Sequence, residues 1–391
     1  MKINRLEAEN FRNLKEIKAD FEDVNIIYGK NAQGKTNLIE AIYLFTGARS
    51  FRGARDSEMI RFGSEKARLK IEFEGGGRAQ TAEIETDGKK KVKLNGIAKK
   101  SVCALGEEIK AVVFSPAHLM LIKGGPAERR RFADDALSQI KSNYSAVLRS
   151  YGRALQQRNI VLKDIFISAD LRSMLYVWDA SLAKEGAKMI YQRQKYLEAL
   201  TPFVKEIFGG ISGGTEEITL KLAGEFDYET LSQAEIENRL LKILNENQNN
   251  DILNKITKAG PHRDDIEILI NGRSARIYGS QGQQRSCVLA LKLAEASLLY
   301  EKTGIKPAAL LDDVMSELDE KRQDYILNHL KDWQVFITCC EEEKLEGLDG
   351  QVFLDETEDA YCVWRADYSA RRRVCTYGMD LFTLEPDGRW S

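Results

Sequence analysis

Apolar and polar positions follow two periodicities along this chain, and the change from one to the other divides the sequence. Residues 24–28 form a short apolar run, residues 68–73 alternate between apolar and polar side chains, and Asn95-Gly96 is a typical hairpin turn. These patterns predict strands and hairpins in the N-terminal part of the chain. Between them, apolar side chains three and four positions apart predict one helix over residues 35–45.

Helical periodicity dominates from about residue 117 to residue 255. A first series of apolar side chains steps by three or four residues, and it comprises Ala133, Leu137, Ile140, Tyr144, Val147, Tyr151 and Ala154. This spacing predicts a coiled-coil-like seam of about three heptads. A second helical run covers residues 170–208, and a third begins at Ser232, where Glu235 completes a capping box. The segment therefore predicts a helical insert, either a short protruding arm or an ordinary helical bundle.

Strand character returns after the insert. Residues 266–270, 308–311 and 334–338 are apolar runs, and a helical pattern follows Ser280. The sequence thus predicts an α/β protein with mixed sheets, split by a helical insert. The expected domains are residues 1–116, 117–255 and 256–355, followed by a tail of residues 356–391 whose role stays open.

Composition limits the classes of protein that remain. A chain of 391 residues exceeds one ordinary core, so two or three domains are expected. With 58 basic and 60 acidic residues the net charge is −2, so any contact with DNA must come from local patches. No apolar run approaches the roughly 18 residues of a membrane span, and the segment after Met1 lacks the apolar stretch of a signal peptide. We therefore expect a cytoplasmic protein with no membrane contact.

A phosphate-binding loop is the first candidate for chemistry. The string that follows the first apolar run fits the pattern G-x-x-x-x-G-K-[ST], and it consists of Gly29, Lys30, Asn31, Ala32, Gln33, Gly34, Lys35 and Thr36. Its glycines let backbone N–H groups point at phosphates, and the dipole of the following helix adds to the attraction. Lys35 is expected to reach the β- and γ-phosphates of ATP, and the Thr36 hydroxyl is expected to bind Mg²⁺.

Two carboxylates end the apolar run of residues 308–311. Asp312 is expected to hold Mg²⁺, directly or through water, because P-loop ATPases bind the metal with an aspartate of this kind. Asp313 is the candidate that orients the attacking water. Aspartate is one methylene shorter than glutamate, so slow hydrolysis is expected. The alternative is that Asp313 only supports Asp312 or caps the next turn.

A third string, Ser280-Gln281-Gly282-Gln283-Gln284, opens a helix. A helix N-terminus beside a glycine attracts anions. Because the chain's own loop already serves its own nucleotide, the natural target is the nucleotide of a second copy. The string resembles the signature loop of ABC-class ATPases, and Ser280, Gly282 and Gln283 are the expected contact residues. It predicts an ATP-gated homodimer, and the alternative is an ordinary N-cap loop.

Local basic clusters are the candidates for DNA binding. They consist of Lys89, Lys90 and Lys91 with Lys93, Lys99 and Lys100, then Arg129, Arg130 and Arg131, and finally Arg149, Arg153 and Arg158 on the first helix of the insert. Such clusters neutralise phosphates without contacting base edges, which predicts salt-sensitive binding that ignores sequence. One alternative is that each cluster is only a solvated surface. Another is that Arg129 and Arg130 bridge to the nucleotide-binding part of the chain.

Several strings together resemble one known family. They are Asn10-Phe11-Arg12-Asn13-Leu14, the phosphate-binding loop with Asn37-Leu38-Ile39-Glu40-Ala41-Ile42, Arg49-Ser50-Phe51-Arg52, Gly124-Gly125-Pro126 with Arg129-Arg130, Gly260-Pro261-His262-Arg263-Asp264-Asp265, Ser280 to Arg285, and Leu311 to Asp319. The combination resembles RecF, a family of bacterial recombination and repair ATPases related to the ABC and chromosome-maintenance ATPases. The resemblance covers about residues 1–355 and does not extend to the tail.

The resemblance implies an ABC-type P-loop ATPase head that binds ATP and Mg²⁺, dimerises around two nucleotides and hydrolyses ATP weakly as a DNA-stimulated switch. It implies binding to DNA where double-stranded and gapped regions meet, at the nucleoid. With RecR and RecO, such proteins help to load RecA onto single strands coated by SSB. It also implies that Arg12 and Asn13 lie near the nucleotide, and that Asp319 ends a loop crossing the dimer interface.

One position departs from the transporter ATPases of the same class. They place a histidine that senses the γ-phosphate after the strand that follows the magnesium aspartate, whereas this chain has Thr338, as RecF-like chains usually do, and we expect it to contact the γ-phosphate less strongly. That difference, and the 312 − 35 = 277 residues between Lys35 and Asp312, argue against the alternative of a transporter motor. A chromosome-organising protein would need a much longer coil. A monomeric metabolic enzyme would leave the string at Ser280 without a role.

Overall fold

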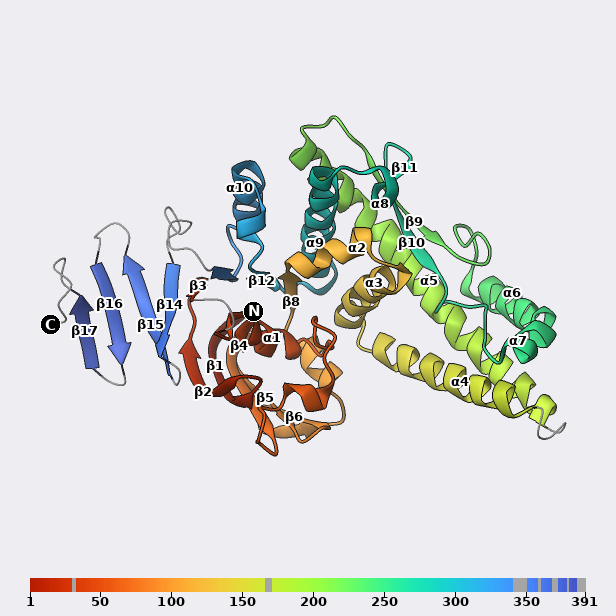
Figure 1. Ribbon diagram of the computed structural model, residues 1–391, viewed down its shortest axis with the longest axis horizontal. Coiled ribbons are helices and arrows are strands. Elements are labelled where there is room, and N and C mark those ends of the chain that lie inside the picture. The colour runs from red at the N-terminus through yellow and green to blue at the C-terminus, as the bar shows by residue number, and fades with distance from the viewer. Residues whose placement is uncertain are drawn as a thin grey trace. The chain divides into compact units, whose positions relative to one another are not determined.

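The computed structural model (Figure 1) describes the backbone of residues 1–29, 33–165, 171–339, 350–357, 360–367, 372–377 and 380–384, and side chains up to residue 339. The chain divides into two compact units, residues 1–118 with 295–391 and residues 119–294. We expected the insert to cover residues 117–255, but the second unit also takes in residues 256–294. The reason is that β10 (Asp265–Ile270) pairs along its whole length with β9 (Ile218–Ala223) of the insert.

The first unit contains a six-stranded antiparallel sheet. In order across the sheet, its strands are β2 (Leu14–Asp20), β1 (Lys2–Phe11), β4 (Ala67–Gly75), β5 (Arg78–Thr86), β6 (Lys90–Leu94) and β7 (Ile97–Lys99). Asn95 and Gly96 join the last two strands with positive φ angles of 51° and 76°, as the tight hairpin predicted from their sequence requires.

An eight-stranded sheet supplies the remaining strands of the first unit. In order across the sheet, they are β17 (Asp380–Leu384), β16 (Arg372–Tyr377), β15 (Ala360–Asp367), β14 (Gly350–Thr357), β3 (Val24–Tyr28), β13 (Val335–Cys339), β12 (Ala308–Asp312) and β8 (Ala111–Phe114). The neighbours from β14 to β8 are parallel, and those from β17 to β14 are antiparallel. The tail that the sequence left open thus contributes β15, β16 and β17.

One apolar core joins both sheets of the first unit to helix α1 (Lys35–Leu44). Ile39 and Ile42 of the helix, Ile71 of β4 and Leu310 of β12 belong to it, and all four are 0% exposed. Burying an apolar side chain of this size stabilises the fold by about 1.5–3 kcal/mol. The core therefore fixes α1 against the strands. Helix α10 (Glu320–His329) follows β12 in this unit.

The second unit is mainly helical. Its helices are α2 (Met120–Lys123), α3 (Pro126–Ile140), α4 (Tyr144–Asp164), α5 (Leu171–Ser212), α6 (Gln233–Glu246), α7 (Gln248–Asn254), α8 (Ala275–Tyr278) and most of α9 (Gln281–Thr303). Strand β11 (Arg273–Ser274) joins β10 and β9 in a small sheet. Helix α5 has 42 residues, which makes it about 63 Å long, and it packs against α4 and α6 (Figure 1).

The length of α5 raises the question of a membrane span. No helix among the described residues combines enough length with enough apolar character to cross a lipid bilayer.

The seam predicted across residues 133–154 is wrong as one continuous helix. Helix α3 ends before Lys141, whose backbone is extended (φ −126°, ψ 108°), and α4 starts at Tyr144. Ala133 and Leu137 are buried on α3. Each helix buries its own apolar stripe, so a spacing of three and four residues carried across the turn imitated a single heptad series.

Two helices begin with capping boxes. The N–H of Ser232 donates to Glu235 Oε2 at 2.8 Å, and the N–H of Glu235 donates to Ser232 Oγ at 3.3 Å, which confirms the predicted start of α6. At α9, the N–H of Ser280 donates to Gln283 Oε1 at 2.7 Å, and the N–H of Gln283 donates to Ser280 Oγ at 3.2 Å. Each box satisfies two backbone donors that the helix itself leaves unpaired.

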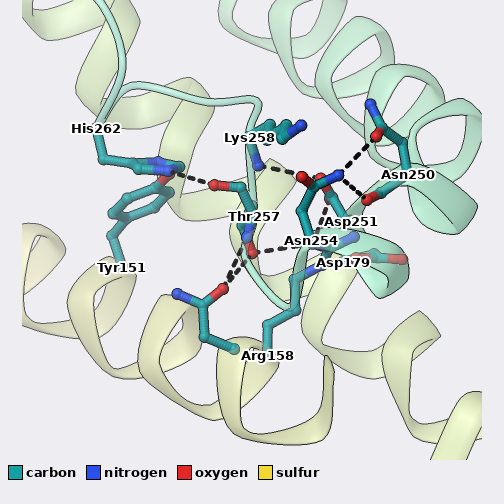
Figure 2. A network of polar contacts seen from close by, with 10 residues as sticks. Tyr151, Arg158, Asp179, Asn250, Asp251, Asn254, Thr257, Lys258 and His262 are labelled. Carbon is teal, nitrogen blue, oxygen red and sulfur yellow. Dashed lines mark hydrogen bonds and ion pairs between the residues drawn. The ribbon is translucent and has the colours of Figure 1, made fainter. Parts of the chain in front are cut away.

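A buried ion cluster joins three helices of the second unit (Figure 2). The guanidinium of Arg158 on α4 donates to Asp179 on α5 at 2.5 Å and to Asp251 on α7 at 2.6 Å. It also donates to the Thr257 hydroxyl at 2.9 Å. The side chain is fully buried, so the expectation that Arg158 contacts DNA is wrong. Arg158, Asp179 and Asp251 are all 0% exposed, and burial raises the pKa of Asp179 although Arg158 opposes the shift. Each charge in this cluster depends on the others, because an unpaired buried charge is very unfavourable.

The string of residues 260–265 is a second junction of the same unit. Tyr151 on α4 shares a hydrogen bond of 2.6 Å with His262 Nδ1. Arg193 on α5 donates to the carbonyl of Pro261 at 2.7 Å. Burial lowers the pKa of His262 to about 4, so the imidazole is neutral near pH 7. Residues 260–265 thus bind α4 and α5 to the start of β10.

Replacing Arg158 should weaken the second unit strongly. Arg158→Met leaves Asp179 and Asp251 buried without a counter-ion, which costs about 3–5 kcal/mol. Hydrogen–deuterium exchange over α4, α5 and α7 should show this loss of protection. Arg153→Met, at an exposed position of the same helix, is the matched control, and it should change protection by less than about 0.5 kcal/mol. Equal protection in the two variants would contradict the role of the cluster.

Candidate functional site

Strand β3 leads directly into the expected phosphate-binding loop. Three of its residues lie outside the described part of the chain: Lys30, Asn31 and Ala32. Gln33 is half-buried, and Gly34 has a φ of 114°, a region that residues with a Cβ rarely adopt. The carbonyl of Gly34 accepts the N–H of Leu38 at 3.0 Å, so the helix starts at the position that the sequence predicts.

Lys35 lies in the first turn of α1 and is 7% exposed. Its Nζ donates to the carbonyl of Gly29 at 2.6 Å, so the side chain reaches back across the loop. The ammonium group is therefore held at the residue that opens the expected loop.

Parallel pairing brings the other expected residues to the same edge. Strand β13 pairs with β3 and with β12, and its register sets Thr338 opposite both Ile27 and Asp312. The carboxyl ends of parallel strands form the edge at which α/β proteins bind ligands. There the Thr36 hydroxyl donates to Asp312 Oδ1 at 2.9 Å, although the two residues are 276 positions apart in the sequence.

Asp312 is a buried carboxylate with two hydroxyl donors. Its residue is 5% exposed, and burial raises its pKa above the ordinary value. Hydrogen bonds from Thr36 and Thr338 oppose this shift, and the nearby guanidinium of Arg52 also favours the charged form. Burial thus disfavours the negative charge of Asp312, and a bound cation would favour it.

The donor set of Thr36 and Asp312 fits Mg²⁺. Magnesium prefers hard oxygen ligands, keeps several waters and takes only one or two ligands from a protein. A hydroxyl and a carboxylate in hydrogen-bond contact meet that requirement. Among the described residues, no three His, Cys, Asp or Glu side chains gather as a transition-metal site would need.

Asp313 follows Asp312 in an unusual backbone conformation. Its φ of 52° lies in the left-handed region, which is uncommon for residues other than glycine. Its N–H donates to the Thr338 hydroxyl at 2.8 Å, and its carbonyl accepts from the Ser316 hydroxyl at 2.9 Å. Asp313 is half-buried, its Oδ1 accepts from the Ser316 hydroxyl at 3.3 Å, and its charge acts on the carboxylate of Asp312.

A buried glutamate on α1 organises the region where we expected Arg12. The guanidinium of Arg12 donates to both carboxylate oxygens of Glu40, at 3.0 and 2.9 Å, and the Ser50 hydroxyl donates to the same carboxylate. Glu40 is 0% exposed. Glu40 and Ser50 belong to the family strings, but the sequence alone assigns them no role. The structure shows that they hold Arg12 on the helix that begins at the phosphate-binding loop.

A second chain of polar contacts ties Asn13 to the same helix. Asn37 on α1 donates to Asn13 Oδ1 at 2.6 Å and accepts from Arg52 at 2.8 Å. The strings at residues 10–14, 37–42 and 49–52 therefore meet around the first two turns of α1. Arg52 also belongs to a family string to which the sequence alone assigned no role. Its side chain, which is 47% exposed, acts electrostatically on Asp312.

The residues expected to act on a second copy occupy helix starts. Ser280 and Gln283 form the capping box of α9, Gly282 lies in its first turn, and Gln283 also donates to Glu216. These residues belong to the second unit, whereas the phosphate-binding loop belongs to the first. Asp319 caps α10 in the first unit, where its carboxylate accepts the N–H of Arg322 at 3.0 Å.

The three lysines expected at DNA lie at the β5–β6 hairpin. Lys89 is exposed, Lys91 is exposed and pairs with Asp87 at 2.8 Å, and Lys90 pairs with Asp56 at 3.0 Å with only 10% of its side chain exposed. A groove of about 1010 Å³ follows this sheet face, and both lysine and glutamate side chains line it. The groove therefore has no uniform positive field.

The three arginines expected at DNA lie on α3. Arg129 is 5% exposed, donates to both oxygens of Asp265 at 2.7 and 2.8 Å, and also reaches two backbone carbonyls. Arg130 donates to the carbonyl of Asp264 at 2.5 Å. Arg131 is partly exposed. Arg129 and Arg130 thus link the expected insert to Asp265 and Asp264, within residues 256–355, and DNA contact by these arginines stays a prediction.

Comparison with known proteins supports the resemblance. The family described as RecF/RecN/SMC N terminal domain matches residues 2–361. The chain is 39% identical over 351 residues to the DNA replication and repair protein RecF of Acetivibrio thermocellus, covering 89% of this chain and 95% of that protein. It is 41% identical over 353 residues to the RecF of Ruminiclostridium cellulolyticum, with 89% and 95% covered.

Solved structures give the same result. A structure described as the recombination mediator protein RecF-ATPrS in the RecFOR pathway has a TM-score of 0.86 at 37% identity, covering 92% of this chain and 97% of that chain. Its RecF-ATP counterpart has a TM-score of 0.83 at 37% identity, covering 90% and 95%. An Smc head bound to the C-winged helix domain of ScpA has a TM-score of 0.54 at 18% identity over 95% of this chain and 99% of that one, which shows a shared fold alone.

The α/β fold, the helical insert and the site around Thr36 and Asp312 define an ATPase of the ABC and SMC class, which confirms the fold class predicted from the sequence. Within that class, the chain belongs to the RecF family of DNA replication and repair proteins.

Removing the charge of Asp312 should not destabilise the fold. Asp312→Asn keeps an oxygen that can accept from Thr36 and Thr338, and it removes a negative charge whose burial is unfavourable. Without added metal, the thermal midpoint should therefore equal or exceed that of the wild type. Asp20→Asn, on an exposed residue paired with Arg5, is the control and should have little effect. A midpoint several degrees lower for Asp312→Asn would contradict this account.

Proposed function

We propose that the chain is an ATP- and Mg²⁺-dependent switch that binds DNA as a homodimer during replication and repair. The observation that carries the proposal is the contact of Thr36 with Asp312 beside the phosphate-binding loop. It joins a loop of the phosphate-binding pattern to a carboxylate in the geometry that a magnesium–nucleotide complex needs. The two RecF structures described with ATP and ATPrS support the choice of nucleotide.

Each proposed residue has one task in the chain's own site. Lys35 holds phosphate oxygens, and Thr36 and Asp312 hold the metal. When bound, Mg²⁺ supplies charge neutralisation for the β- and γ-phosphates. Asp313 accepts a hydrogen bond from the attacking water and so orients it. We infer weak hydrolysis, stimulated by DNA, because the short aspartate side chain reaches less far than a glutamate.

The second half of each site comes from another copy of the chain. In this proposal Ser280, Gly282 and Gln283 contact the nucleotide of the partner, and Asp319 lies in the loop that crosses the interface. The start of α9 is suited to this task, because a helix N-terminus attracts anions and Ser280 is exposed at it. Binding of ATP thus favours the dimer over the monomer.

DNA binding follows from dimerisation in this proposal. Lys89, Lys91 and Arg131 are the candidate phosphate contacts with exposed or partly exposed side chains, although Lys91 also pairs with Asp87 and Arg131 with Asp135. Arg129, Arg130 and Lys90 are more deeply engaged within the protein. Such contacts favour no base sequence. The RecFOR pathway named for the solved relatives supports a place at gapped DNA, where the dimer acts with RecR and RecO to load RecA on strands coated by SSB.

The dimer depends on the start of α9. Ser280→Arg should bind ATP–Mg²⁺ as a monomer, because the long cation blocks the loop that caps the partner's nucleotide. Sedimentation with and without ATP–Mg²⁺, then with a gapped duplex, should show no ATP-dependent dimer and at least about tenfold weaker DNA binding, since the phosphate contacts are no longer doubled. Ser232→Arg, which removes the equivalent capping serine of α6, is the matched control and should dimerise normally. An ATP-dependent dimer of Ser280→Arg would refute the role of the loop.

Replacing Asp313 should reduce the hydrolysis of ATP much more than it reduces the binding of ATP. Asp313→Asn should bind ATP–Mg²⁺ and dimerise, but its turnover should fall about 100-fold, because an amide accepts a proton from water poorly. Phosphate release under single-turnover conditions checks this. Asp324→Asn on α10 serves as a control for a change of charge outside the site. Unchanged turnover in Asp313→Asn would assign the task to another residue.

A further inference from the structure

Thr338 on β13 is connected to both aspartates of the site. Its hydroxyl donates to Asp312 Oδ1 at 3.2 Å and accepts the N–H of Asp313 at 2.8 Å. A threonine hydroxyl has one proton to donate, so the two contacts use the donor and one lone pair in a defined direction. Thr338 is 1% exposed, which keeps water from competing for either contact. The hydroxyl is therefore committed to Asp312 and Asp313.

The second contact holds an unusual backbone turn. Asp313 has a φ of 52°, and a residue with a side chain stays in that region only where its surroundings hold it. Parallel register sets Thr338 opposite Asp312, so the next N–H along β12 turns to meet the Thr338 hydroxyl. Ser316 holds the carbonyl of Asp313 on the other side of the residue at 2.9 Å. The direction of the Asp313 side chain follows from this turn.

In the first contact, Thr338 donates to a carboxylate oxygen of Asp312 that already accepts from Thr36. Thr36 and Thr338 both donate to Asp312 Oδ1, at 2.9 and 3.2 Å. Two donors from different elements fix the plane of the carboxylate, whereas one donor leaves it free to rotate about its last bond. Thr36 must also present its oxygen to the proposed metal, whereas the proton of Thr338 serves only to orient Asp312.

We propose that Thr338 is a positioning residue that couples the metal-binding carboxylate of Asp312 to the water-orienting carboxylate of Asp313. The inference rests on the proposed function of the site. It differs from the expectation at the sequence level, in which Thr338 stands in for a histidine that touches the γ-phosphate. Here the threonine acts through its neighbours, and the same hydroxyl sets the geometry for metal binding and for hydrolysis.

The test compares Thr338→Val, which keeps the shape but removes the hydroxyl, with Thr338→Ser, which keeps the hydroxyl. Loss of a hydrogen-bond partner of a metal ligand lowers metal affinity or activity by about 10–100-fold. Thr338→Val should therefore raise the Mg²⁺ concentration for half-maximal binding of a fluorescent ATP analogue about tenfold. It should lower single-turnover hydrolysis by about 10–100-fold. Affinity for the analogue in EDTA should not change, and Thr338→Ser should behave as the wild type.

A matched control separates this role from a general loss of stability. Thr86→Val removes a hydroxyl that is also buried in the first unit, where it accepts the N–H of Gly88 at 3.3 Å. It should leave Mg²⁺ dependence and hydrolysis unchanged. In addition, hydrogen exchange without nucleotide or metal should be faster at Asp313 in Thr338→Val than in the wild type or in Thr338→Ser.

The outcomes are distinguishable. The proposal is supported if Thr338→Val shows faster exchange at Asp313 and a higher Mg²⁺ requirement, and if Thr338→Ser returns both to the wild-type values. The same Mg²⁺ requirement and hydrolysis in Thr338→Val and Thr86→Val would overturn it, and so would a failure of serine to restore them. Wild-type protein that bound the ATP analogue equally with Mg²⁺ and with EDTA would overturn the proposed function and this inference together, whereas the exchange result would still report on the hydroxyl itself.

Discussion

The hydrogen bond between Thr36 and Asp312 is the contact on which the rest of the site depends. It links the helix after the phosphate-binding loop to the end of a strand 276 residues later. The contact exists because β3, β13 and β12 are adjacent and parallel, so their carboxyl ends reach the same edge. The apolar core that holds α1 against both sheets keeps that edge in register. The helical insert can therefore be large without disturbing the site.

Burial makes the negative charge of Asp312 unfavourable for the stability of the fold, but it also suits the site to binding a cation. The surroundings raise the pKa of Asp312, so its negative charge is held at a cost to stability that a bound cation would offset. The left-handed turn at Asp313 adds local strain. The neighbouring hydroxyls of Thr36, Thr338 and Ser316 keep both aspartates in place. A site prepared in this way would need little rearrangement of its own groups to bind the proposed metal–nucleotide complex.

Local patterns predicted much of this site and little of the polar packing around it. The strand of residues 24–28 and the start of α1 followed from apolar spacing and from the glycine before Lys35. The break at Lys141 could not be found, because two short helices with matching stripes imitate one long one. Nor could the burial of Arg129, since a run of arginines has the same sequence whether Asp265 or solvent faces it. Such long-range partners depend on the register of β10 with β9, which no local pattern contains.

A double-mutant cycle on Thr36 and Asp312 tests the central claim most directly. The affinity for ATP in the presence of Mg²⁺ would be measured for Thr36→Val, Asp312→Asn, the double variant and the wild type. If the two residues hold one metal ion together, the losses are not additive, and the coupling free energy is about 1–3 kcal/mol. Losses that add within about 0.3–0.5 kcal/mol would mean that Thr36 and Asp312 act independently, and they would contradict a shared magnesium site.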